Sequence, residues 1–91
     1  MRVVLHLPDS GSLKSKRMII SGLLRRVRQQ LKVSAAEVGE QDRWQLAELA
    51  IATVSGDGRH ADEVLASVLR FIESHSDGAR ITDVSTELVK L

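Results

Sequence analysis

Two stretches of the chain repeat their hydrophobic residues at the spacing of an α-helix, roughly 100° of rotation per residue. In residues 12–32, one face of the helical wheel collects Leu13, Ile19, Ile20, Leu23, Leu24, Val27 and Leu31. The second stretch begins at Asp57 or Gly58 and closes at 74–78, and its repeating residues are Ala61, Val64, Leu65, Val68, Leu69 and Ile72. Ser12 is a candidate N-cap, because its hydroxyl can accept a hydrogen bond from a free backbone N–H. The pattern predicts two amphipathic helices.

Four other segments have the composition of β-strands. Residues 3–7 are rich in β-forming side chains and stop at a turn-forming run that starts with Pro8. Residues 33–39 and 44–55 flank a short polar turn, which predicts a hairpin. The alanines of the second of these segments would also suit a helix, but a glycine-containing turn ends it abruptly, so we predict a buried central strand. Residues 81–91 are predicted to form a last strand at the edge of the sheet.

The order of these elements is strand, helix, strand, strand, helix, strand. Two such halves predict an α+β fold of the ferredoxin-like plait type, βαββαβ, with a four-stranded antiparallel sheet and both helices on one face. Right-handed crossovers place the first and third strands in the centre of that sheet. A chain of 91 residues has the length of one domain, so we expect residues 1–91 to share one modest core.

Basic residues are concentrated in the first predicted helix. Residues 12–32 hold seven of the thirteen Lys and Arg residues, and no acidic residue occurs between positions 10 and 36. The rest of the chain has six basic residues against all twelve acidic ones, so a nearly neutral protein is divided into a basic segment and an acidic remainder. Like charges on one helix face destabilise it by about 0.2 to 0.5 kcal/mol per neighbouring pair. An anionic partner would relieve this repulsion.

The helical wheel places five of these cations on one flank beside the apolar stripe, and Lys16 lies near the helix N-terminus, where it could assist them. The predicted RNA- or anion-binding residues are Lys14, Lys16, Arg17, Arg25, Arg28 and Lys32. Lys and Arg bind phosphates and release their counterions, and Arg can also donate two hydrogen bonds at once. Trp44 and Phe71 are the only aromatic residues, which excludes an RNA-recognition motif that stacks several bases on its sheet. We therefore expect recognition of backbone and shape.

Several sequence motifs also resemble one family of small bacterial proteins. They are SLKSKR at 12–17, VSAAEVGEQDRWQ at 33–45, Val54-Ser55 and His60-Ala61. Together they resemble the YlxP-like proteins, which have no assigned biochemical activity. The resemblance implies a ferredoxin-like fold. It also implies a link to RNA or the ribosome, because the genes of such proteins often lie among those for transcription, translation initiation and ribosome maturation.

These observations favour a small non-enzymatic accessory protein that binds RNA or a ribonucleoprotein, with the ribosome as one candidate, and needs no cofactor. The alternative is a homo-oligomeric protein-interaction module. In a plait one sheet face is uncovered, and the alanine-rich third strand could offer a smooth apolar patch to a second subunit. Partner contacts would then come from the hairpin tip, at Gln41, Asp42, Arg43 and Trp44. Trp44 could instead fold over the edge of its own core.

The evidence for an enzyme is weak, and we expect no enzymatic activity. His6, His60 and His75 lie on separate predicted elements, which does not suit a metal site. Three acids could converge across the hairpin, namely Glu37, Asp42 and Glu48, although strand carboxylates usually face water. The segment 11–15 partly resembles a phosphate-binding loop but lacks the Gly-Lys-Ser/Thr ending that such a loop requires.

The expected environment is the cytoplasm. The chain has no cysteine, which excludes a disulfide framework and thiol chemistry. Its N-terminal apolar run is too short for a signal peptide, and no segment approaches the length of a membrane span. A basic amphipathic helix can also lie on a membrane surface. Here its apolar stripe is needed for the core, so we expect no membrane contact.

Overall fold

A computed structural model describes residues 1–8, 10–76 and 78–91 of the chain. Asp9, in the predicted turn after Pro8, and Asp77, in the predicted close of the second helix, lie outside the described residues. The elements in chain order are β1 (Arg2–His6), α1 (Leu13–Leu31), β2 (Ser34–Gly39), β3 (Leu46–Ala52), α2 (Gly58–His75) and β4 (Arg80–Ser85).

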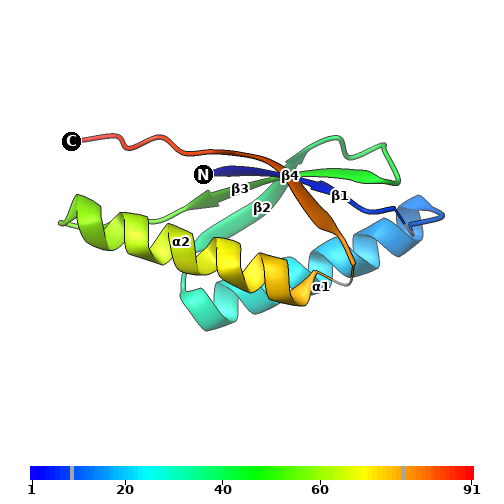
Figure 1. Cartoon of the computed structure of the whole chain (residues 1–91), viewed down its shortest axis with the longest axis horizontal. Helices are drawn as coiled ribbons and strands as arrows, with labels where there is room; N and C mark the ends of the chain where they lie inside the picture. Colours follow the sequence, from blue (N-terminus) through cyan, green and yellow to red (C-terminus); the bar gives the residue numbers. More distant parts are fainter. Residues whose placement is uncertain (9, 77) are drawn as a thin grey trace.

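The four strands form one antiparallel sheet in the order β2-β3-β1-β4, and both helices lie against the same face of it (Figure 1). This confirms the α+β ferredoxin-like plait, with the first and third strands in the centre. Helix α1 contacts strand β2 and helix α2. One flank of α1 therefore borders the β2 edge of the sheet.

The core lies between the sheet and the two helices. Alternate residues of the central strands point inward and are buried, and they are Val3, Leu5, Ala47, Leu49 and Ile51. The helices contribute the predicted stripes, of which Ile20, Leu23, Leu24, Val27, Leu65, Val68 and Ile72 are buried. The strict alternation along β3 explains why the alanine-rich segment forms a strand: one face packs on the helices and the other stays accessible.

Helix α1 begins at the predicted N-cap, Ser12, and α2 begins after an N-cap at Asp57, one of the two residues predicted to start it. The Ser12 hydroxyl accepts a hydrogen bond from the Ser15 backbone N–H at 3.0 Å, and the Asp57 carboxylate accepts one from the Arg59 N–H at 3.0 Å. At the other end of α1, Lys32 adopts the left-handed conformation (φ 53°, ψ 47°), and its N–H donates to the Arg28 carbonyl. The chain then turns directly into β2.

Replacing Ser12 with alanine should lower the free energy of unfolding by about 1 kcal/mol, since the first turn of α1 loses its side-chain hydrogen-bond acceptor. Urea denaturation followed by circular dichroism measures this change. Ser21→Ala is the matched control, because Ser21 lies exposed in the middle of the same helix and alanine is the better helix former there. Equal stability of the Ser12 variant and wild type would contradict a capping role.

Three predicted strands are longer than the observed ones. Strand β2 begins at Ser34 instead of position 33. Strand β3 spans Leu46–Ala52 instead of 44–55, so Trp44 lies in the loop before it. The last strand ends at Ser85, and the predicted strand over 86–91 is wrong. Ser85 pairs with Arg2, the first residue of β1, so the residues that follow it have no β1 partner with which to continue the ladder.

Candidate nucleic-acid interface

Five of the six predicted cations lie exposed on one side of α1. We call Lys14, Arg17, Arg25, Arg28 and Lys32 the basic flank. None of the five forms an ion pair with a carboxylate in residues 1–8, 10–76 or 78–91. Arg28 also has a structural contact, because its Nε and Nη2 donate to the Ala35 carbonyl of β2 at 2.9 and 2.6 Å. The basic flank is thus anchored beside the β2 edge, and its charge is uncompensated there.

Lys16 does not belong to this surface, and its prediction as an anion-binding residue is wrong. Its side chain is 1% exposed. The ammonium Nζ lies 2.9 Å from Glu37 Oε2 and donates a hydrogen bond to the Glu40 carbonyl. The contact with Glu37 is an ion pair that lacks hydrogen-bond geometry. The hydrogen bond of Lys16 is therefore the one to the Glu40 carbonyl. Its charge ties the first turns of α1 to the β2–β3 hairpin and is not available to a ligand.

Arg26 lies on the opposite side of α1, toward α2. It is half-buried, and its Nη2 donates to the His75 carbonyl in the last turn of α2 at 3.3 Å. A cation suits that end of a helix, where the carbonyl oxygens lack partners within the helix. Arg26 therefore joins the two helices.

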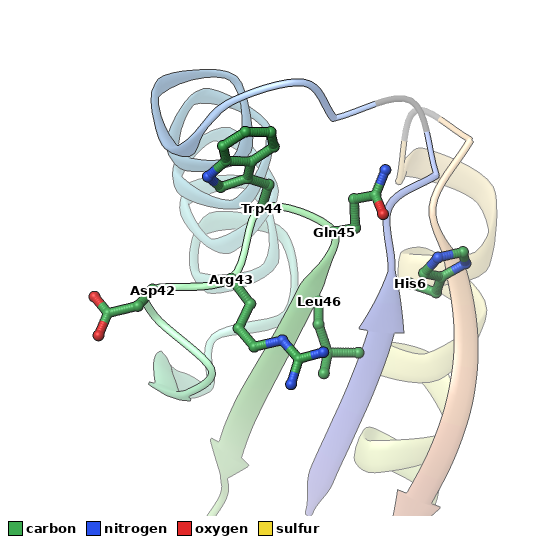
Figure 2. Close-up of a pocket in the computed structure, with 6 residues that line it drawn as sticks. All are labelled: His6, Asp42, Arg43, Trp44, Gln45 and Leu46. Atoms are coloured by element: carbon green, nitrogen blue, oxygen red, sulfur yellow. The ribbon is translucent and has the colours of Figure 1, made fainter.

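The hairpin between β2 and β3 forms a shallow hollow of about 410 Å³. Six residues line it, namely His6, Asp42, Arg43, Trp44, Gln45 and Leu46 (Figure 2). Trp44 is 54% exposed and is not packed against the core, so the interpretation that it covers the core edge is wrong. The hollow brings three of the four predicted partner residues together, and the fourth, Gln41, lies exposed in the same loop.

The open face of the sheet is crossed by charged side chains. Arg2 Nε lies 2.5 Å from Glu48 Oε1, and Arg2 Nη1 lies 3.1 Å from Asp83 Oδ2, so one guanidinium links β3, β1 and β4. The hydrogen bonds to Glu48 and then to Asp83 raise the pKa of Arg2 above its ordinary value. A smooth apolar patch on this face was predicted from the alanines of β3. That prediction is wrong, because the outward residues of β3 include Glu48.

The acidic residues that could have formed a catalytic group are separated. Glu37 faces the helices and pairs with Lys16, whereas Glu48 lies on the open sheet face with Arg2. Residues on opposite faces of a sheet cannot act on one substrate atom. Within the described parts of the chain, no group of three His, Cys, Asp or Glu residues is arranged to hold a metal ion.

Neither helix of the described residues has an apolar stretch long enough to cross a bilayer.

Comparison with known proteins agrees with the sequence motifs. Residues 1–86 match the family described as "Protein of unknown function (DUF503)". The chain is also similar to a Bacillus subtilis (strain 168) protein, "Uncharacterized protein YlxP", with 42% identity over 66 residues, which cover 72% of each chain. The predicted resemblance to YlxP-like proteins is thereby confirmed. This chain belongs to the DUF503 family of proteins of unknown function.

Proposed function

We propose that this protein binds RNA, free or within a ribonucleoprotein such as the ribosome, through the phosphate backbone and without catalysis. The observation that carries the proposal is the basic flank of α1, with five exposed cations and no carboxylate paired to them in the described residues. A row of cations on a rigid helix suits a chain of regularly spaced phosphates. The fold supplies the rigidity, because the opposite face of α1 is packed in the core.

The distribution of charge over the molecule supports the same ligand. In the described residues the paired cations lie elsewhere: Arg2 binds two carboxylates on the open sheet face, Lys16 binds Glu37 inside the fold, and Arg43 lies 3.8 Å from Glu40 in the hairpin loop. Charges that are already neutralised contribute little to steering a polyanion. Arg59, Arg70, Arg80 and Lys90 are also exposed, but they are spread over α2, β4 and the segment after it. The basic flank gathers five cations on one side of a helix, so it is the surface at which RNA would gain most by releasing counterions.

The salt dependence of binding tests this proposal. If five phosphates are neutralised on a single strand, the logarithm of the affinity should fall with the logarithm of salt concentration with a slope of about −3.5. Fluorescence anisotropy of a labelled single-stranded RNA, titrated at a series of KCl concentrations, gives this slope. A pull-down from a cell lysate with and without ribonuclease then separates an RNA ligand from a protein one. Binding that does not change with salt would contradict the proposal.

A homo-oligomer is the alternative function, and the structure gives it less support. The open sheet face that would mediate it carries the Arg2 ion pairs, which would have to be desolvated in an interface. Sedimentation velocity over a concentration series distinguishes the two proposals. We expect a monomer at all concentrations, whereas a dimer that resists high salt would favour the oligomer.

A further inference from the structure

The hairpin hollow combines an exposed indole with polar groups that have unused hydrogen-bonding capacity. Gln45 uses its Nε2 to donate to the Pro8 carbonyl at 3.2 Å, which leaves its Oε1 as an acceptor. Arg43 has only a loose ion pair with Glu40, 3.8 Å long and largely exposed, so its donors remain accessible. His6 contributes an imidazole from β1 (Figure 2). The hollow thus offers a flat aromatic surface with both donors and acceptors around it.

The size of the hollow suits one small ligand. Its volume of about 410 Å³ is near the lower end for small-molecule sites, and it is largely open to solvent. Figure 2 shows the side chains of Trp44, Gln45 and Arg43 on the loop and His6 on the neighbouring strand, with the Asp42 carboxylate directed away from them. Of the two charged side chains that line the hollow, Arg43 is therefore the one placed to meet a negatively charged group.

The hollow is held next to the N-terminal end of the basic flank. The Lys16 ammonium donates to the Glu40 carbonyl at the start of the hairpin loop, which fixes that loop to the first turns of α1. Lys14 and Arg17 lie in those same turns and are exposed. The first turns of α1, which carry Lys14 and Arg17, and the hairpin loop are therefore held in a fixed position relative to each other.

We propose that this hollow binds one unpaired base of RNA, stacked on the indole of Trp44, while the basic flank holds the neighbouring phosphates. The inference deepens the proposed function and rests on it. Charge decides between RNA and a protein partner here, because the adjoining cations favour a polyanion and the loop has only one large apolar side chain, Trp44. Every base has a face that stacks on an aromatic ring, so such a site would prefer single strands without selecting a sequence.

The test uses the intrinsic fluorescence of the full chain, which has one Trp and no Tyr, so the emission reports on Trp44 alone. A short single-stranded RNA is titrated into the protein, followed by an abasic strand with the same number of phosphates and by a fully paired duplex. We expect quenching by the single strand only. Labelled-RNA anisotropy should show that Trp44→Ala weakens single-strand binding roughly 5- to 150-fold, while Trp44→Phe retains most of it.

Leu88→Ala is the matched control, because Leu88 is exposed to a similar extent (52%) and lies in the segment after β4, far from the hairpin in Figure 1. The salt slope should be the same in wild type and both Trp44 variants, since every phosphate-binding cation is kept. RNA that binds with the expected slope but leaves Trp44 fluorescence and the Trp44→Ala affinity unchanged would overturn the base site and leave the proposed function standing. Absence of RNA binding by both methods would overturn both proposals.

Discussion

Replacing Glu37 with leucine should lower the free energy of unfolding by about 3 kcal/mol, because it leaves the buried Lys16 ammonium without its counter-charge. Lys16 is 1% exposed and cannot turn to water without opening the contact between α1 and the hairpin. Its remaining hydrogen bond, to the Glu40 carbonyl, offsets only part of the loss. The effect is large because a lone buried charge is far less stable than a buried pair.

Removing Lys16 instead of Glu37 should lower the free energy of unfolding by a smaller amount. In Lys16→Met the charge left behind is the Glu37 carboxylate, whose Oε2 is buried without a hydrogen bond but whose side chain as a whole is more exposed (18%) than that of Lys16 (1%). We expect a loss of about 1 to 2 kcal/mol, near the value for an unsatisfied polar group. The double variant Lys16→Met, Glu37→Leu should recover most of the stability, because apolar residues of similar volume often replace a buried ion pair without loss.

Urea denaturation of the wild type, both single variants and the double variant forms a double-mutant cycle that measures the coupling of Lys16 to Glu37. Additive effects of the two substitutions would contradict a buried pair. Unchanged stability in Glu37→Leu would show that the Lys16 side chain reaches solvent in solution.

Removing the charge of the basic flank should weaken RNA binding on the order of 100-fold at low salt, because phosphate contacts supply nearly all non-specific affinity. The variant replaces Lys14, Arg17, Arg25 and Lys32 with glutamine. Arg28 is kept, since its guanidinium holds the Ala35 carbonyl of β2 and its loss would confuse binding with stability. The salt slope should fall in magnitude by about 2.8, at about 0.7 for each phosphate of a single strand that is no longer neutralised.

A matched control removes the same number of positive charges from other exposed positions. Arg59, Arg70, Arg80 and Lys90 lie on α2, on β4 and after it, all exposed and away from the basic flank. Replacing these four with glutamine changes the net charge equally. We expect it to leave the salt slope of RNA binding near the wild-type value. Equal losses in the two variants would mean that net charge, and not the basic flank, governs binding.

The overall fold was accessible from the sequence because its signals are local and agree with one another. The apolar stripes predict the two helices, the cap at Ser12 marks the start of the first, and the apolar run of β3 predicts a strand. Their order then leaves few topologies for a chain of this length. The end of β4 was missed because residues 81–91 keep a strand-like composition, whereas the extent of a strand is set by its partner, β1.

The candidate site was harder to predict, because the sequence does not show which residues a charged side chain will contact in the fold. The burial of Lys16 had one signal in the sequence: on the helical wheel it falls within the apolar stripe, between Ile20 and Leu23, and not on the basic flank. Its pairing with Glu37 depends on how the hairpin packs against α1, and this tertiary contact cannot be predicted from the local sequence pattern. The hollow around Trp44 likewise arises from two segments far apart in sequence, at His6 and the hairpin loop.

The most direct test of the central claim is a ¹H–¹⁵N NMR titration of the protein with a short single-stranded RNA. We predict that the backbone amides that shift will be those of the basic flank, from Lys14 to Lys32, and of the hairpin loop around Trp44. The chemical shifts of amides on the exposed side of α2 and on the open sheet face should not change. Shifts confined to the open sheet face, or none at RNA concentrations where anisotropy shows saturation, would contradict the proposed interface.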